Sequence, residues 1–448
     1  MNDTIAAIST TTGIGAISII RLSGEDSINI INKVFTKNLI NADSHTIHYG
    51  HIKDGKEVID EVLVSLMRAP KTFTREDIIE INCHGGIAPT NKVLEVLLKN
   101  GARLAEPGEF TKRAFLNGRI DLLEAEATMD LISSRSDKAR KMSINTLTGE
   151  TSNLIKDLRS DLVGIISNIE VNIDYPEYED IEVLTNEKLL PSINKFKEKL
   201  EHIIKKSEDS KMVKEGIKVG IIGKPNVGKS SLLNSLLEEE KAIVTDIPGT
   251  TRDIVEGNIV LDGIILNIVD TAGIRETEDV VEKIGVERSL SIINLSDLVI
   301  FILNNNEKLS EEEKELLQKL EDKKKIIVVN KIDLENKLDK TYLENYIEIS
   351  AKDGIGINKI KEEIKRLFNL GELESNDMTY LSNARSISLL HKTMNSINEA
   401  INEIELNSPI DIVEFSLKDA WNSLGEVIGE TYTDELLDEL FSRFCLGK

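Results

Sequence analysis

Eight residues near the middle of the chain have the types and spacing of a phosphate-binding loop. Gly223–Ser230 reads Gly-Lys-Pro-Asn-Val-Gly-Lys-Ser, the pattern G-x-x-x-x-G-K-S. Its glycines let backbone N–H groups curl around an anionic oxygen, and a following helix adds partial positive charge. Lys229 is expected to reach the β- and γ-phosphates, and Ser230 offers its hydroxyl to Mg²⁺. Apolar patterning predicts a strand over 219–222 and a helix over 231–237 around this loop.

Two motifs that could sense a γ-phosphate follow the loop. Within Thr-Asp-Ile-Pro-Gly-Thr-Thr-Arg-Asp (245–253), Thr251 can complete the Mg²⁺ shell when a γ-phosphate is present. A strand over 264–269 ends in Asp-Thr-Ala-Gly. There Asp270 is placed to act on the Mg²⁺ shell, and the N–H of Gly273 can contact the γ-phosphate.

Two later motifs predict specificity for guanine. A strand over 326–329 delivers Asn-Lys-Ile-Asp, whose Asp333 carboxylate accepts hydrogen bonds from guanine N1–H and the 2-amino group, which adenine cannot donate. Ser-Ala-Lys (350–352) matches the loop behind the base. Either motif alone is ordinary turn chemistry, but five elements in this order, each at a strand end, predict a GTPase domain. The residues expected around the nucleotide are Asn226, Val227, Gly228, Lys229, Ser230, Ser231, Thr245, Asp246, Ile247, Pro248, Gly249, Thr250, Thr251, Asp270, Thr271, Ala272, Gly273, Asn330, Lys331, Asp333, Ser350, Ala351 and Lys352.

The residue after Asp-x-x-Gly departs from the Ras pattern. Ras-like proteins carry a water-orienting glutamine there, whereas this chain has Ile274, which can neither donate nor accept a hydrogen bond. Another group must therefore position the attacking water, or hydrolysis is slow. The acidic stretch that follows offers four carboxylates, which these residues alone do not rank: Glu276, Glu278, Asp279 and Glu282.

Bulk properties limit the class of protein. A chain of 448 residues is long enough for several domains, and only Cys83 and Cys445 are present, so no disulfide framework is expected. No signal peptide and no apolar run of membrane-spanning length is visible, which predicts a cytoplasmic protein without a membrane span. The sequence has a net charge of −23 and lacks the cluster of basic residues that a protein needs to bind nucleic acid on its own. If RNA is the substrate, another subunit is expected to carry most backbone contacts.

Periodicity divides the chain into three kinds of structure. Residues 1–118 mix β-like runs (4–9, 16–22, 58–67 and 78–83) with short helices, which predicts an α+β domain. Residues 119–215 and 372–448 have helical periodicity, with Leu122, Leu123, Ala125, Met129 and Ile132 on one predicted face. Residues 216–371 alternate strands and helices as a Ras-like α/β domain does. The two helical stretches form either one discontinuous domain that holds the α/β insert or two small separate units; we predict the former.

Over its whole length the chain resembles the MnmE (TrmE) family, the GTPases of bacterial and organellar tRNA wobble-uridine modification. The motifs that carry the resemblance are the phosphate loop with Asn226, residues 245–253, Asp-Thr-Ala-Gly-Ile-Arg (270–275), Val-Glu-Lys-Ile-Gly-Val-Glu-Arg (281–288), Gly-Glu-Phe-Thr-Lys-Arg-Ala-Phe-Leu-Asn (108–117) and Phe-Cys-Leu-Gly-Lys (444–448). The last of these distinguishes the family from translation and ribosome-assembly GTPases, which share only the nucleotide-binding domain.

The resemblance implies a division of labour. The N-terminal domain would bind a tetrahydrofolate derivative (5-formyl- or 5,10-methylene-) and form a homodimer. A flavoprotein partner, MnmG (GidA), would bind FAD and most of the tRNA in a heterotetramer. Together they would add an aminomethyl or carboxymethylaminomethyl group to C5 of the wobble uridine. GTPase domains of the family pair across K⁺, whose ligands fall here on Asn226, Thr245, Ile247 and Thr250, and the family's catalytic glutamate falls on Glu282.

The family's folate positions fall on Arg21, Glu80, Arg119 and Lys448. A carboxylate such as Glu80 can accept paired hydrogen bonds from the amino-pyrimidine edge of a pterin. Arg119 stands where many members have lysine, so a planar fork replaces a point charge. Arg21 has the alternative reading of a surface ion pair. Cys445 is either a thiol that takes part in the uridine chemistry or a small apolar residue that packs the final helix.

The leading hypothesis is therefore a K⁺-activated GTPase that drives tRNA modification with a partner. The main alternative is a regulatory switch, for example in ribosome assembly, and a scaffold without turnover is a third. A folate domain and the Cys-Leu-Gly-Lys segment, for which a pure switch has no need, favour the first. The intact set Lys229, Ser230, Thr251 and Asp270 disfavours the third.

Removing the expected catalytic carboxylate separates hydrolysis from binding. In Glu282→Ala we expect GTP hydrolysis in K⁺ buffer to be lost and GTP affinity to stay near wild type, because the carboxylate orients water rather than the nucleotide. Phosphate release and equilibrium nucleotide binding measure the two quantities. Unchanged turnover would remove Glu282 from the mechanism.

Overall fold

The computed structural model describes residues 3–174, 186–238, 255–261, 264–269, 282–368 and 379–448. Contacts within the chain divide it into two compact units. Unit 1 contains Met1–Met129, Thr146–Ile193 and Asn395–Lys448, and unit 2 contains Asp130–Asn145 and Asn194–Met394. Both units combine segments from before and after the nucleotide-binding motifs.

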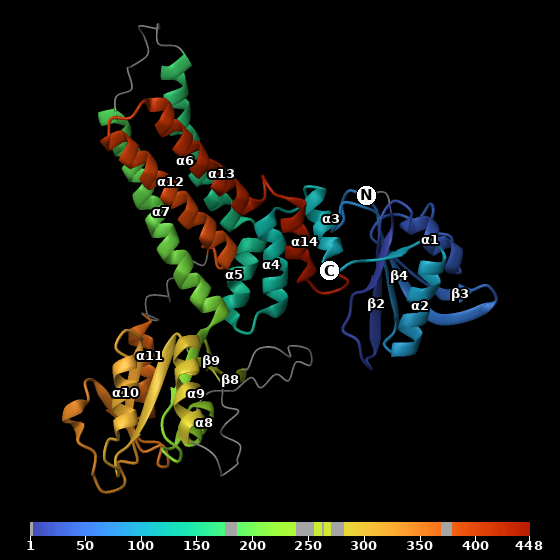
Figure 1. Ribbon diagram of the computed structural model, residues 1–448. Helices are drawn as coiled ribbons and strands as arrows, with labels where there is room; N and C mark the ends of the chain where they lie inside the picture. Colours follow the sequence, from blue (N-terminus) through green and yellow to red (C-terminus); the bar gives the residue numbers. More distant parts are fainter. Residues whose placement is uncertain (1–2, 175–185, 239–254, 262–263, 270–281, 369–378) are drawn as a thin grey trace. The chain divides into compact units, whose positions relative to one another are not determined.

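A six-stranded mixed sheet forms the N-terminal part of unit 1, in the order β3-β4-β5-β2-β1-β6 (Figure 1). All neighbours are antiparallel except β1 and β6, which are parallel. The elements of this part are β1 (Ile5–Ile8), β2 (Ile17–Ser23), α1 (Ser27–Val34), β3 (Thr46–Asp54), β4 (Glu57–Met67), β5 (Ile78–His84), α2 (Ile87–Lys99), β6 (Arg103–Leu104) and α3 (Glu109–Leu116).

Side chains alternate between the two faces of this sheet. Ile20 and Leu22 of β2, like Ile79 and Ile81 of β5, join the core that α1 and α2 cover. Because successive strand residues point to opposite faces, residues 21 and 80 lie on the other face. There a second small core forms from Ile5, Ala7, Ala105 and Phe110.

The helices outside the two sheets are α4 (Leu122–Ser133), α5 (Asp137–Leu147), α6 (Glu150–Asp174), α7 (Asn186–Glu215), α12 (Ala384–Glu405), α13 (Ile410–Ile428) and α14 (Asp434–Ser442). In unit 1, α6 and α13 pack side by side although the nucleotide-binding domain separates them in sequence (Figure 1). Lys418 pairs with Glu170 at 2.9 Å, and the guanidinium of Arg159 lies 4.1 Å from the ring centroid of Trp421.

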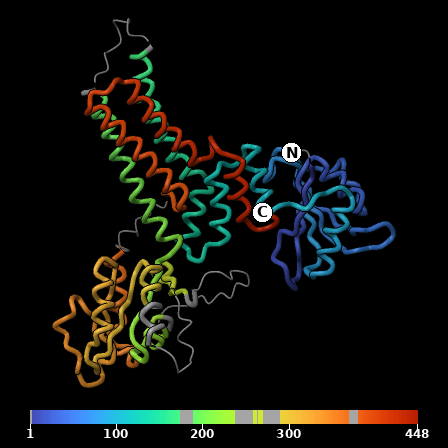
Figure 2. The backbone as a smooth tube through the Cα atoms, in the orientation of Figure 1, coloured from blue at the N-terminus to red at the C-terminus, as the bar shows by residue number. Residues whose placement is uncertain are grey.

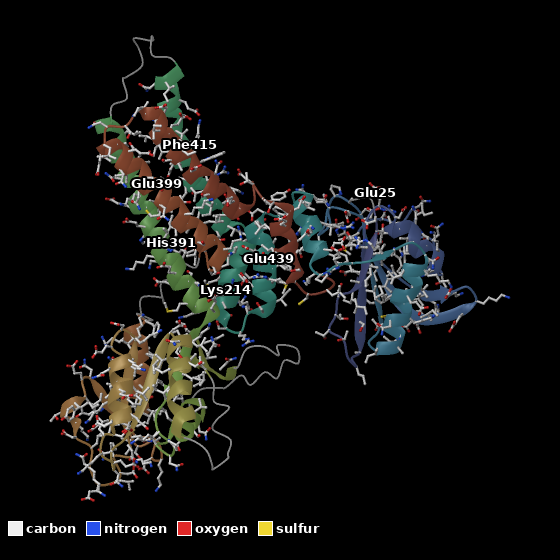
Figure 3. All side chains as sticks on the ribbon, in the orientation of Figure 1. Glu25, Lys214, His391, Glu399, Phe415 and Glu439 are labelled. Atoms are coloured by element: carbon white, nitrogen blue, oxygen red, sulfur yellow. The ribbon has the colours of Figure 1, made fainter. Side chains whose placement is uncertain are left out.

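A second pairing of helices from the two stretches lies in unit 2. His391 lies on α12 (Figure 3), and its Nε2 is 3.1 Å from Oε1 of Glu208 on α7. The helical segments before and after the insert therefore pack on each other, and the discontinuous arrangement is confirmed over the alternative of two separate helical units.

The nucleotide-binding domain in unit 2 is a six-stranded sheet in the order β12-β11-β10-β7-β9-β8. Every neighbouring pair is parallel except β8 and β9. Its elements are β7 (Ile217–Ile222), α8 (Lys229–Glu238), β8 (Val255–Leu261), β9 (Ile264–Val269), α9 (Glu282–Leu295), β10 (Leu298–Asn304), α10 (Glu311–Lys319), β11 (Lys325–Asn330), the 3₁₀ turn η1 (Lys340–Tyr342), β12 (Tyr346–Glu348) and α11 (Ile357–Leu367).

Helices cover both faces of this sheet, as a parallel sheet requires. Alternate residues of β10 enter different cores: Ile300 meets the face that carries α8 and α11, and Phe301 meets the face that carries α9 and α10. Because the strands are parallel, their carboxyl ends lie at one edge of the sheet, and the loops with the nucleotide motifs begin there.

The predicted strands and helices are confirmed, and their ends shift by at most two residues. On the predicted face of α4, Leu122, Leu123 and Ala125 are buried, whereas Ile132 at its far end is 47% exposed. Within the part of the chain that the structure describes, no helix is both long and apolar enough to span a bilayer.

Arg159 is expected to be a packing element of the α6–α13 pair. Its side chain is buried, covers the Trp421 ring and pairs with Glu430. Arg159→Ala should cost about 1–3 kcal/mol because the stem packing and the cation–π contact are both lost. Thermal unfolding followed by circular dichroism should show a lowered midpoint.

Arg140→Ala is the matched control. Its guanidinium is half-exposed and pairs with Asp137 three residues away, a kind of pair worth about 0–1 kcal/mol. Equal midpoints for the two variants would contradict the packing role of Arg159.

Candidate functional site

The phosphate loop connects β7 to α8, and its lysine lies inside the loop. Nζ of Lys229 donates to the carbonyl oxygens of Gly223 at 2.8 Å and Lys224 at 2.7 Å. Burial lowers the pKa of Lys229 because the charged ammonium is partly removed from water. α8 begins at Lys229, so Ser230 lies in the first helical turn, where its hydroxyl suits a Mg²⁺ ligand. The strand and the helix predicted around the loop are thus confirmed.

Gly228 has to be a glycine for two reasons. Its φ of +100° lies where side chains are rarely tolerated, and an added Cβ would lie 2.2 Å from Nδ2 of Asn330. The close approach lets the loop contact the strand that carries the guanine motif.

Asn330 joins two loops to the end of β11 through one side-chain amide. Its Nδ2 donates to the carbonyl of Val227 in the phosphate loop at 2.7 Å, and its Oδ1 accepts from the N–H of Ala351 at 3.0 Å. The side chain is 2% exposed, so both bonds are protected from water. Asn330 therefore holds the phosphate loop and the loop of residues 350–352 at fixed positions around the end of β11.

The remaining guanine-motif residues lie beside this amide. Ser350 Oγ donates to Asp333 Oδ1 at 3.0 Å and also lies 2.8 Å from Asp353. Asp333 and Lys352 are exposed and can meet a ligand, while Lys331 takes a φ of +65° at the turn. The geometry brings together Asn226–Ser231, Asn330, Lys331, Asp333 and Ser350–Lys352 at one edge of the sheet.

Several predicted site residues fall outside the described residues, namely Thr245, Asp246, Ile247, Pro248, Gly249, Thr250, Thr251, Asp270, Thr271, Ala272 and Gly273, together with the alternative carboxylates Glu276, Glu278 and Asp279. Glu282 is the first residue of α9, but its side chain also lies outside the part of the chain that the structure describes.

A second candidate site lies in unit 1, on the sheet face opposite α1 and α2. Arg21 of β2 and Glu80 of β5 are directly opposed in the strand register. Nε and Nη2 of Arg21 lie 2.9 and 2.7 Å from Oε1 of Glu80, and about a fifth of each side chain is exposed. Arg21 therefore forms an ion pair with Glu80, as its alternative interpretation held, and both side chains are partly exposed.

The segment 445–448 returns to this pair from the far end of the sequence (Figure 2). The carbonyl of Gly447 accepts from Ser9 Oγ at 3.2 Å and from Arg21 Nη1 at 3.5 Å. Gly447 has a φ of +84°, and an added Cβ would lie 2.4 Å from the carbonyl oxygen of Ile8. Only glycine lets the chain lie so close to β1.

Lys448 is held next to Arg21 and Glu80 by its backbone. The N–H of Phe110 at the start of α3 donates to the main-chain oxygen of Lys448 at 3.2 Å. Burial lowers the pKa of Lys448, and the nearby Arg21 guanidinium lowers it further. Three predicted folate residues thus lie together: Arg21, Glu80 and Lys448.

Arg119 and Cys445 take part less directly. The guanidinium of Arg119 lies 4.8 Å from the ring centroid of Phe73, which packs against the same small core as Phe110. Cys445 is exposed, and its carbonyl accepts from the N–H of Gly108 at 3.4 Å. Cys445 is thus exposed rather than buried against the final helix, and its part in the uridine chemistry stays a prediction.

Sequence reasoning missed the platform that holds segment 445–448. The segment accepts hydrogen bonds from the hydroxyl of Ser9 and from the backbone N–H groups of Gly108 and Phe110. No sequence motif predicts contacts of this kind. The one available signal was the quoted run 108–117, whose glycine and phenylalanine form this platform.

Two family models match the chain. The "GTP-binding protein TrmE N-terminus" model matches residues 4–119, and the "MnmE helical domain" model matches residues 122–445. The protein "tRNA modification GTPase MnmE" of Bacillus velezensis is 51% identical over 458 residues, covering 100% of both chains. The protein of the same name in Listeria welshimeri is 51% identical over 454 residues, covering 100% of this chain and 99% of its own.

The chain belongs to the MnmE family. Membership places it among the tRNA modification GTPases, which are GTP-hydrolysing enzymes. The helical family model matches on both sides of the α/β insert, as the discontinuous helical domain requires.

Similarity to solved structures is confined to part of the chain. The G domain of FeoB from Methanococcus jannaschii is 25% identical, covers 34% of this chain and 98% of its own, and gives a TM-score of 0.25. A TM-score of this size supports no conclusion about function.

The Asn330 amide can be tested by an isosteric change. Asn330→Asp keeps an acceptor for Ala351 but cannot donate to Val227, so a buried carbonyl loses its partner. We expect GDP affinity to fall roughly tenfold or more. Binding of a fluorescent GDP analogue measures it.

Asn345→Asp, in an exposed turn, is the control and should bind as wild type does. Wild-type affinity in Asn330→Asp would show that the phosphate loop does not depend on this amide.

Proposed function

We propose that this protein hydrolyses GTP and, with a flavoprotein partner, modifies C5 of the wobble uridine of certain tRNAs. The observation that carries the proposal is that one chain holds two clusters of predicted site residues. One is the phosphate and guanine loops joined by Asn330, and the other is Arg21, Glu80 and Lys448. Family membership over the whole chain joins these sites to tRNA modification.

In the nucleotide site, Lys229 would neutralise the β- and γ-phosphates and Ser230 would hold Mg²⁺, completed by Thr251. The described donors fit, since Lys229 lies within the loop and Ser230 lies at a helix N-terminus. Asp270 would act on the Mg²⁺ shell. Glu282 would orient the attacking water in place of the glutamine that Ile274 replaces.

We propose further that two GTPase domains pair across K⁺. The ligands would be Asn226 with the Thr245, Ile247 and Thr250 segment. Asn226 fits this role because its amide oxygen is a hard donor, and the residue is exposed at the corner of the loop. A cation there would supply the positive charge that an arginine finger supplies elsewhere.

The Arg21–Glu80–Lys448 cluster would bind a tetrahydrofolate that carries a one-carbon unit, either 5-formyl- or 5,10-methylene-. The donor set fits: Oε1 of Glu80 accepts from Arg21, and among the described residues nothing donates a hydrogen bond to its second oxygen, so that oxygen can accept from an amino-pyrimidine edge. Arg119, stacked on Phe73, would offer a cation at the margin. When bound, the folate would supply the carbon that the uridine receives.

The division of the chain into domains is part of the proposal: 1–118 for folate binding and homodimer formation, 119–215 with 372–448 as the helical domain, and 216–371 as the GTPase domain. Because the net charge is −23, most tRNA contacts would come from the flavoprotein MnmG (GidA) in a cytoplasmic heterotetramer. The exposed Cys445 would present its thiol to the uridine chemistry beside the folate cluster.

A regulatory GTPase switch remains the alternative, and the folate cluster discriminates between them. A switch needs no enclosed carboxylate and ammonium on the N-terminal sheet, whereas a one-carbon transfer enzyme does.

The function is tested by mass analysis of wobble uridines in cells that lack the protein. We expect the C5 modification to be absent and wild-type protein to restore it. Glu80→Ala should fail to restore it and should lose binding of labelled 5-formyltetrahydrofolate, yet hydrolyse GTP when purified, because Glu80 lies in the other unit.

Glu95→Ala, an exposed partner of Lys92 on the same domain, is the control and should restore modification. Normal wobble uridines in cells without the protein would refute the proposed function. If Glu80→Ala binds labelled 5-formyltetrahydrofolate as well as wild type does, only the assignment of the folate site fails.

A further inference from the structure

The phosphate loop is tied to α10 by an ion pair that belongs to none of the nucleotide-binding motifs. Nζ of Lys224, the second residue of the loop, lies 3.1 Å from Oε2 of Glu313. The Glu313 side chain is 6% exposed and that of Lys224 is 30% exposed. The attraction therefore acts in a partly desolvated place, where it is stronger than at an open surface.

Glu313 is itself held before it meets Lys224. Its Oε2 accepts from the N–H of Ser310 at 2.8 Å and from the Ser310 hydroxyl at 3.0 Å, and the N–H of Glu313 donates back to Ser310 Oγ. This is a capping box at the start of α10. Leu316 and Leu320 of the same segment pack into the core beneath the sheet. The carboxylate is consequently a fixed point of the domain.

A second fixed point lies three residues further along the loop. The carbonyl of Val227 accepts from the buried amide of Asn330 at 2.7 Å. The corner Pro225-Asn226 lies between the two anchors, and Asn226 has a φ of +60°. A non-glycine residue keeps this left-handed backbone only when its surroundings hold it there.

We propose that the Lys224–Glu313 ion pair is a positioning device for this corner. By fixing the backbone on one side of Asn226, it sets how well the loop fits the nucleotide phosphates and the monovalent cation. Lys224 acts through the backbone: its ammonium is engaged by Glu313, while its carbonyl accepts from Lys229 at 2.7 Å. The part that concerns the cation rests on the proposed role of Asn226 as a K⁺ ligand.

Lys224→Met and Glu313→Gln each remove one charge of the pair, and glutamine still supports the capping box. We expect each variant to bind a fluorescent GDP analogue about three- to tenfold more weakly, and to need about three- to tenfold more K⁺ for half-maximal hydrolysis. At saturating GTP and K⁺, kcat should stay within about twofold of wild type, since the reacting groups are intact. Lys224→Arg should restore both quantities, and the double variant should be no worse than either single variant.

The matched controls are Lys314→Met and Glu311→Gln. These residues form a 2.7 Å ion pair on the same helix, but Glu311 is 87% exposed and neither residue is paired with the loop. Both should bind GDP and respond to K⁺ as wild type does.

Wild-type GDP affinity and K⁺ requirement in both Lys224→Met and Glu313→Gln overturn the inference. If Na⁺ serves the wild-type protein as well as K⁺ does, the potassium part of the proposed function fails. The GDP affinities of the same variants then decide the inference by themselves.

Discussion

One buried amide constrains the whole nucleotide-binding edge. Asn330 stands at the end of β11, and its donor and acceptor are used on two different loops, that of Val227 and that of Ala351. A carboxylate or a hydroxyl in its place could not make both bonds in these directions. Because the amide is 2% exposed, water does not compete for either bond. The phosphate and guanine loops therefore cannot shift independently.

The second site is organised by a different constraint, the register of an antiparallel sheet. Arg21 and Glu80 are direct cross-strand partners, so their ion pair follows from the pairing of β2 with β5. Gly447, from the other end of the sequence, lies against β1, where a side chain would not fit. A site built this way needs both the first and the last hundred residues, which makes its assembly dependent on the packing of α14 near α3.

The excess of acidic residues bears on how the protein would contact tRNA. Three described cations in these sites, Lys224, Lys229 and Arg21, are paired with carboxylates or loop carbonyls. With a net charge of −23, such a protein gains little from direct electrostatic attraction to a polynucleotide. That balance fits the proposed arrangement in which the flavoprotein carries the tRNA.

The sequence by itself determined the elements and the local chemistry. The strand ends, the phosphate loop and the guanine motif depend on residues close together in the chain, where spacing and φ requirements are readable. Through the family resemblance it also predicted that Arg21, Glu80, Arg119 and Lys448 share one site, and the structure brings Arg21, Glu80 and Lys448 close together. The sequence did not determine that Ile132 would be exposed, because a helical period shows which residues share a face but not how far the partner surface extends.

Only the tertiary structure decided which distant groups meet. The pairing of α6 with α13, the platform of Ser9 and Phe110 under segment 445–448, and the Lys224–Glu313 ion pair each join residues far apart in sequence. A lysine and a glutamate are common surface residues in any sequence of this composition. What gives this pair its consequence is the burial of Glu313 and the distance of 3.1 Å, and both arise from packing rather than from residue type.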